Sequence, residues 1–428
     1  MTIFNRIKKH STILKNTGYL TIIEFFRLLM PFIALPYLIS TVGSEKYGMV
    51  IFIQTIISYF SYFINFGLDV SAVKDISTNR DSKNKLSEIV CTVLGIKFCF
   101  FLISLLILSV SLSIIPFGRL HAFLFYSAFL TCFSDVLFPV WFFQGIEKMK
   151  YLTIIRAASI FLYTGGIFIF IKVPDHYERI ALLQSICNLF AGGISAFILI
   201  HIIQLKISIP SSANMKTTIK NAFPFFLSRI SNFFNGTLGD IICGAFFSMH
   251  LVAAYDLMHK IASGASLPMS MLNQAVYPHI ANTKNRLFAT KFFFVAIGVS
   301  FLIGLCMFTL APLANEIFAN GMLPESIILI KIAGVIMFIT GIDVYMGAPI
   351  LVSFGFPRAF NVSVYLATAV LIVTYLFLYI TGNMTYITFV IAIALAEIAT
   401  TIYRFYYCKK FKLIDFSLLR KKNKTSTN

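Results

Sequence analysis

Long apolar runs alternate with short polar segments along the whole chain. Each run is close to the roughly 20 residues that an α-helix needs to cross a bilayer. A membrane β-barrel would instead show weaker alternating segments of about ten residues. The pattern therefore predicts an all-α polytopic membrane protein with twelve transmembrane helices. The predicted spans are residues 14–41, 48–70, 89–116, 122–144, 154–173, 180–203, 223–247, 252–276, 292–318, 326–353, 361–380 and 386–407.

Polar side chains interrupt the first two spans at helical spacing. Glu24 and Arg27 lie three residues apart in the first span and so share one face. The second span carries a polar stripe that includes Gln54, Asn65 and Asp69. Because an ionisable group at bilayer depth costs roughly 2.5–3.5 kcal/mol, we expect these side chains to face a protein interior or a cavity.

The seventh and eighth spans carry polar stripes as well. Arg229, Asn232 and Asp240 lie along one face of the seventh span. Asp256 and Lys260, four residues apart, share a face of the eighth. The first two helices of each half of the chain therefore carry matching stripes.

These matching stripes predict the domain organisation. Proline or glycine also interrupts the first span of each half, and interrupted helices at matching places in two halves point to a central binding site. We expect two six-helix lobes, residues 1–209 and 210–428, around a polar cavity. Arg27, Arg229 and Lys260 would line that cavity at different depths.

The same charges also have a purely structural interpretation. Glu24 would pair with Arg27, and Asp256 with Lys260, so that each pair only holds helices together. For either pair alone, both interpretations stay open. The alignment across four helices favours the cavity, whereas Asp343 in the tenth span is less specific.

The charge of the chain fits a membrane better than nucleic acid. Charged residues make up only 12% of the sequence, against about 25% in soluble proteins, and mean hydropathy is +0.85. The net charge of +18 is concentrated in short loops on one side, which is the positive-inside pattern. The basic residues on the predicted outer side are only four: Lys46, Arg119, Lys172 and Arg179. We therefore expect the bilayer as a partner, no nucleic acid, and both termini in the cytoplasm.

Recognisable catalytic chemistry is missing from the sequence. It contains no Ser/His/Asp set, no glycine-rich phosphate loop, and no Cys or His spacing typical of a metal site. We expect no enzymatic activity, no metal and no cofactor. A cationic cavity suits a large anion, and the planar fork of Arg is well matched to phosphate. An amphiphile with a phosphate head and a lipid tail is the predicted ligand class.

The segment PVWFFQGIEKMKYLTIIR, residues 139–156, contains the single tryptophan of the chain, Trp141. It follows the fourth span, where aromatic residues anchor helices at the membrane interface. Lys148, Lys150 and Arg156 would hold the loop inside. The sequence favours an interfacial anchor over a substrate contact, and it leaves open whether residues 145–153 form a hinge.

Several segments, spread over both halves of the chain, together resemble a known family. They are LPYLISTVGSEKYGMVIF (35–52), INFGLDVSAVKDIS (64–77), PVWFFQGIEKMKYLTII (139–155), FPFFLSRISNF (223–233), AAYDLMHKI (253–261) and AVYPHIA (275–281). Their order and spacing resemble the O-antigen flippases (Wzx-type) of the polysaccharide transporter family. That family belongs to the multidrug/oligosaccharidyl-lipid/polysaccharide exporter superfamily.

The resemblance implies a twelve-helix transporter of the bacterial inner membrane. It would flip undecaprenyl-diphosphate-linked O-antigen oligosaccharide units from the cytoplasmic to the periplasmic face by alternating access, for lipopolysaccharide biosynthesis. Arg229 and Lys260 match basic positions typical of the family, and Arg27 matches more loosely. Asp256 and His259 depart from its pattern. An O-antigen polymerase and a chain-length regulator are further implied partners.

Two other functions and the energy source stay open. One alternative is a membrane-integral O-antigen polymerase or ligase, although the short outer loops count against it. The other is a drug exporter of the same superfamily. A proton or sodium ion could bind, or the membrane potential alone could drive transport. The candidate coupling or cavity-lining residues are Glu24, Asp69, Asp240, Asp256, Asp343, Gln54, Asn65 and Asn232.

Overall fold

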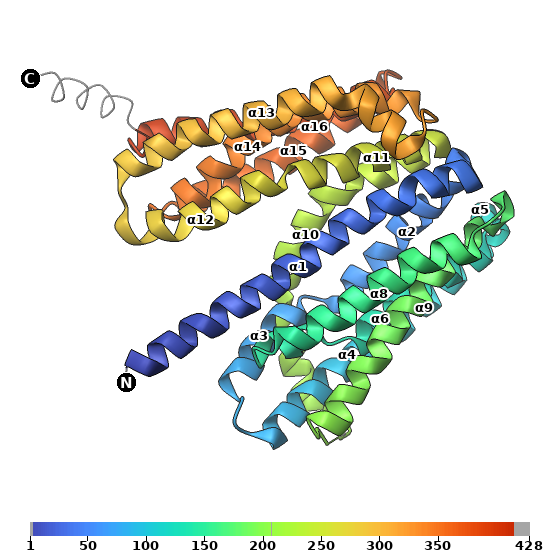
Figure 1. Ribbon diagram of the computed structural model, residues 1–428, viewed down its shortest axis with the longest axis vertical. Coiled ribbons are helices and arrows are strands. Elements are labelled where there is room, and N and C mark those ends of the chain that lie inside the picture. The colour runs from blue at the N-terminus through green and yellow to red at the C-terminus, as the bar shows by residue number, and fades with distance from the viewer. Residues whose placement is uncertain (1–2, 207, 415–428) are drawn as a thin grey trace, which may run out of the picture. The chain divides into compact units, whose positions relative to one another are not determined.

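Helices make up the regular structure in the part of the chain that the structure describes (Figure 1). The computed structural model describes residues 3–206 and 208–414, and the side chains of all of these except 3–17, 19–22, 228 and 231–238. The α-helices are α1 Ile3–Val42, α2 Ser44–Asn65, α3 Leu68–Thr78, α4 Lys83–Ile114, α5 Pro116–Leu120, α6 Ala122–Leu137, α7 Val140–Gly145, α8 Met149–Phe170, α9 Tyr177–Phe197, α10 Ser212–Phe246, α11 Met249–Ala265, α12 Leu267–Thr283, α13 Arg286–Ala319, α14 Pro324–Tyr345, α15 Pro357–Ile380 and α16 Tyr386–Lys410. Among the short helical segments, η1 Pro174–His176 precedes α9, η2 Ile198–Ile202 continues α9 and η3 Met346–Val352 continues α14.

The predicted class, an all-α polytopic membrane protein, is confirmed. Among the described residues, ten helical stretches are long and apolar enough to cross a membrane. The predicted spans 223–247 and 252–276 are not among the ten, so the count of twelve is not confirmed by this measure. The second of them is broken at Ser266, because Pro268 opens α12 and a proline lacks the N–H that would continue the helix.

The chain forms two compact units, Met1–Ala253 and Ala254–Asn428. In the first unit, α6 packs on α9 and on α2, α8 packs on α1, and α10 packs on α2, α3 and α4. Although α10 begins after the predicted lobe boundary, its contacts with α2, α3 and α4 lie within this first unit. The lobe boundary at 209/210 stays a prediction.

In the second unit, α13 and α14 pack side by side, and α16 packs on both α14 and α15 (Figure 1). The contact between α13 and α14 is close because glycines face each other. A Cβ on Gly304 would lie 2.6 Å from the carbonyl oxygen of Gly334, and one on Gly334 would lie 2.7 Å from that of Gly304. Small residues that allow backbones to approach are the usual basis of helix packing in membranes.

Trp141 has a different role from the interfacial anchor that the sequence predicted. The side chain is only 1% exposed and lies in the core of the first unit with Phe142 and Phe143. The short helix α7 is pressed against α3, since a Cβ on Gly145 would collide with Ile76. The interface prediction was wrong because local sequence cannot show that α7 turns its aromatic residues into the protein rather than toward lipid headgroups.

Candidate functional site

The site is centred on a break in the second predicted span, between α2 and α3. Phe66 and Gly67 have φ angles of 41° and 68°, so both adopt left-handed conformations that interrupt the helix. The Phe66 ring stacks on that of Phe226 in α10, with centroids 4.4 Å apart. Gly67 faces the α10 backbone so closely that a Cβ would lie 2.7 Å from the Phe226 nitrogen. The break therefore docks directly on α10.

Replacing Gly67 with alanine is expected to loosen this docking. The new methyl group would meet α10 backbone atoms that cannot move without displacing the helix, and the left-handed φ adds about 1 kcal/mol of strain. We expect a loss of about 2–3 kcal/mol of stability, measured as a lower melting temperature of the purified protein. Gly382→Ala is a matched control, because Gly382 has a nearly equal φ of 67° but has open space around its Cβ position. Equal effects of the two substitutions would contradict the close contact.

Four side chains meet at the break, and we call them the Asp69 cluster. Lys97 in α4 is 2% exposed, and its Nζ donates to Asn65 Oδ1 at 2.7 Å and to Asp69 Oδ1 at 2.8 Å. On the other side of the carboxylate, Arg229 Nη1 in α10 lies 3.6 Å from Asp69 Oδ2. The cluster thus joins α2, α3, α4 and α10.

The two cations of the cluster differ in what they can do. Lys97 is buried, and a buried charge is tolerated only when it is paired and hydrogen-bonded, so Asp69 and Asn65 are committed to it. The Arg229 side chain is 43% exposed, and its distance to Asp69 exceeds that of a normal hydrogen bond. With one carboxylate against two cations, the cluster carries a net positive charge. Part of the guanidinium fork of Arg229 remains available to an anion.

The rest of the predicted stripe on α2 connects helices within the first unit. Gln54 donates to Gln184 in α9 at 2.5 Å, and Ser61 donates to the Asp135 carboxylate in α6. These contacts tie α2 to its neighbours. The cavity-lining role of Gln54 stays a prediction, and its side chain is bonded to Gln184 inside the unit.

The two predicted ion pairs are both present, which confirms the pairing expected by the structural interpretation. Arg27 pairs with Glu24 on α1, and both side chains are about half exposed. Lys260 pairs with Asp256 on α11, where both are more deeply placed. The structure therefore brings Arg229 to Asp69 and Asn65, and it places Arg27 and Lys260 in separate pairs on their own helices.

The remaining predicted site residues are Asp240, Asn232 and Asp343. Asp240 is half-buried on α10. The side chain of Asn232 lies outside the described residues. Asp343 is buried in the second unit, where Arg404 Nη1 donates to Asp343 Oδ2 at 2.6 Å and Arg404 Nε donates to Ser363 Oγ at 2.8 Å. The pair ties α14 to α16.

Lys97 and Arg404 are the charged residues that the sequence prediction missed. Lys97 stands alone in the apolar run 89–116, and Arg404 lies near the end of the last span. A lone cation at bilayer depth needs a counter-charge, so each could have been matched to a carboxylate in another span. Among the described residues, no group of three metal-ligating side chains gathers at the cluster or elsewhere.

Comparison with known proteins identifies the family. Residues 13–284 match the family described as polysaccharide biosynthesis protein. The chain belongs to this family. Two relatives named "Putative O-antigen transporter" are similar in sequence. The one from Escherichia coli (strain K12) is 28% identical over 271 residues, covering 63% of this chain and 65% of that protein. The one from Shigella dysenteriae is 27% identical over 300 residues, covering 68% and 73%.

The match to the Escherichia coli relative spans just under two thirds of its length. Similarity to solved structures extends over most of this chain. A structure described as lipid II flippase MurJ in an inward closed conformation has a TM-score of 0.72 at 14% identity, covering 91% of this chain and 87% of that one. An inward-facing multidrug resistance MATE family transporter of the MOP superfamily has a TM-score of 0.65 at 15% identity, covering 95% and 99%. The family resemblance in the sequence is thereby confirmed, together with the shared fold.

Proposed function

We propose that this protein flips undecaprenyl-diphosphate-linked O-antigen oligosaccharide units across the bacterial inner membrane by alternating access. The observation that carries the proposal is the Asp69 cluster, in which a half-exposed Arg229 stands beside a satisfied buried ion pair at a helix break. A diphosphate is the ligand class that such an arginine suits best. The names of the relatives, O-antigen transporter and lipid II flippase, support a lipid-linked substrate.

Arg229 is the residue that we assign to the diphosphate. Arg27 and Lys260 are proposed as further phosphate contacts, which the substrate would draw away from Glu24 and Asp256 respectively. The pair of Arg27 and Glu24 is about half exposed and therefore weak, so charge-assisted hydrogen bonds to a doubly charged ligand favour the exchange there.

We also propose roles for the other polar residues of the predicted site. Asn65 and Asn232 are proposed to line the path of the substrate. Asp240 and Asp343, with the carboxylates already named, are the candidate proton or sodium sites. The membrane potential is an alternative driving force, since moving one negative charge outward gains about 2.3 kcal/mol per 100 mV.

We propose the orientation that the distribution of basic loops favours, with both termini in the cytoplasm. In that orientation the substrate enters from the inner leaflet and leaves at the periplasmic face. An O-antigen polymerase and a chain-length regulator would then receive the product. The similarity to a multidrug transporter concerns the fold alone, and the net positive charge of the Asp69 cluster favours an anionic substrate over a cationic drug.

Reconstitution tests the proposal. The purified full-length chain is placed in liposomes with a lipid-linked oligosaccharide labelled in one leaflet, and its transfer to the other leaflet is followed by an impermeant enzyme or lectin. We expect faster transfer than in protein-free liposomes and no comparable movement of a cationic dye. In cells that lack the protein, the lipid-linked unit should accumulate on the cytoplasmic face. Accumulation on the periplasmic face would support the polymerase or ligase instead.

A further inference from the structure

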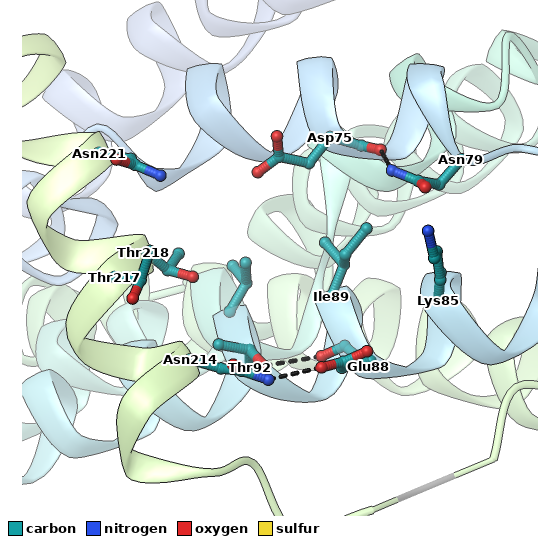
Figure 2. A pocket seen from close by; sticks show the side chains of 11 residues that line it. Asp75, Asn79, Lys85, Glu88, Ile89, Thr92, Asn214, Thr217, Thr218 and Asn221 are labelled. Carbon is teal, nitrogen blue, oxygen red and sulfur yellow. Dashed lines mark hydrogen bonds between the residues drawn. The ribbon is translucent and has the colours of Figure 1, made fainter.

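A polar pocket opens at one end of the first unit, between α3, α4 and α10 (Figure 2). We call it the inner pocket, because the C-terminus of α3 and the N-termini of α4 and α10 meet there, and the sequence predicts that these ends face the cytoplasm. Its volume is about 360 Å³, within the range of small-molecule sites. All of its walls belong to one compact unit.

Uncharged amides and hydroxyls supply most of the polar lining. They are Asn79, Thr92, Asn214, Thr217, Thr218 and Asn221. Asp75 and Glu88 add two carboxylates, Lys85 adds one cation, and Ile89 and Val93 add an apolar patch. Amides and hydroxyls can both donate and accept, while carboxylates only accept. This combination suits a ligand with many hydroxyl groups and an apolar C–H face, which describes a sugar.

Two opposite walls of the inner pocket differ in their hydrogen bonds. On one wall, Asn214 Nδ2 donates to Glu88 Oε1 at 2.5 Å, which joins α10 to α4 (Figure 2). Within α4, Thr92 Oγ1 donates to the Glu88 carbonyl at 2.7 Å. On the other wall, Asn79 Nδ2 donates to the backbone carbonyl of Asp75 at 2.8 Å. No hydrogen bond within the described part of the chain occupies the Asp75 carboxylate, which leaves it able to accept from a ligand.

The pocket and the Asp69 cluster share three helices, α3, α4 and α10. On each helix, a pocket residue lies about 8–12 Å along the axis from a cluster residue, at the rise of an α-helix. The pairs are Asp75 and Asp69 on α3, Thr92 and Lys97 on α4, and Asn221 and Arg229 on α10. In a lipid-linked sugar of the inner leaflet, the diphosphate lies between the lipid tail and the sugar. A sugar site should therefore lie on the cytoplasmic side of the phosphate site and close to it, as the inner pocket does in the predicted orientation.

We infer that the inner pocket binds the sugar next to the diphosphate of the incoming lipid-linked oligosaccharide, before translocation. This inference rests on the proposed function and adds a site that recognises the carbohydrate rather than the lipid diphosphate. Because two carboxylates face one lysine, the inner pocket favours neutral or amino sugars over carboxylated ones.

Binding in lipid nanodiscs tests the inference with two probes. One is undecaprenyl diphosphate, and the other is the lipid-linked oligosaccharide isolated from cells that lack this protein. We expect the wild-type chain to bind the second probe more tightly. The double variant Asp75→Asn and Glu88→Gln should bind it at least tenfold more weakly, as expected for one lost hydrogen bond to a charged group, and should bind undecaprenyl diphosphate as before.

Matched controls separate the possible outcomes. Asp81→Asn removes a nearby exposed carboxylate outside the pocket lining and should change neither affinity. Arg229→Gln should weaken both probes. Equal wild-type affinity for the two probes, or an equal loss of both in the double variant, would overturn the sugar site and leave the flippase proposal standing. Failure of the wild type to bind either probe would instead remove the proposed function. Oligosaccharide freed from its lipid should bind weakly and lose that binding in the double variant.

Discussion

Replacing Arg229 with glutamine is expected to reduce flipping of the lipid-linked oligosaccharide at least tenfold. Glutamine keeps polar atoms of similar reach but loses the charge and the planar fork. A hydrogen bond to a charged group contributes about 1.5–3 kcal/mol, which corresponds to a factor of about ten to one hundred. The measurement is the initial rate of leaflet transfer in liposomes that contain equal amounts of wild-type or variant protein.

Two further variants sharpen this experiment. Arg229→Lys keeps the charge and should retain part of the activity, since an ammonium cannot contact two phosphate oxygens as the guanidinium does. Arg358→Gln removes an exposed arginine of the second unit and should leave the rate unchanged. A wild-type rate in Arg229→Gln would show that the diphosphate binds elsewhere.

Replacing Asp69 with asparagine is expected to destabilise the first unit by about 3 kcal/mol. The change leaves the Lys97 ammonium, only 2% exposed, without its counter-charge. Removal of one partner of a buried ion pair typically costs about 3–5 kcal/mol, because the other charge stays in a low-dielectric surrounding. Thermal unfolding can be followed by the fluorescence of Trp141, which lies in the core of the same unit.

The double variant with Lys97→Met provides the decisive comparison. Methionine is of similar length and apolar, so it should restore most of the stability lost in Asp69→Asn. Asp81→Asn, an exposed carboxylate near the same end of the unit, should have little effect. If Asp69→Asn were as stable as the wild type, or if Lys97→Met made it worse, the buried pair would not be the source of the stability.

The sequence predicted the fold class well because the bilayer allows few alternatives. Every backbone polar group in hydrocarbon must be satisfied within the protein, by a helix or a closed barrel, and apolar runs of about 20 residues fit helices rather than barrel strands. The break at Ser266 was harder to predict, because hydropathy averages across it and only Pro268 marks it. The buried position of Trp141 was not predictable from its neighbours, since its packing partners lie on helices far away in sequence.

The sequence predicted three of the four residues of the Asp69 cluster. Helical spacing identified Asn65, Asp69 and Arg229, because each belongs to a stripe that recurs along its own helix. Lys97 belongs to no stripe, and its place in the cluster depends on how α4 packs against α2 and α3. Periodicity describes one helix at a time, whereas a site is a property of several helices together.

The packing of α10 within the first unit has a consequence for biosynthesis. Asp69 and Lys97 leave the ribosome close together, so the emerging chain can form a neutral ion pair early. Arg229 follows only after roughly ten seconds of further synthesis at typical elongation rates. The site therefore acquires its excess positive charge last, when α10 docks on Gly67, and an unfinished chain presents no open cation there to anionic lipids.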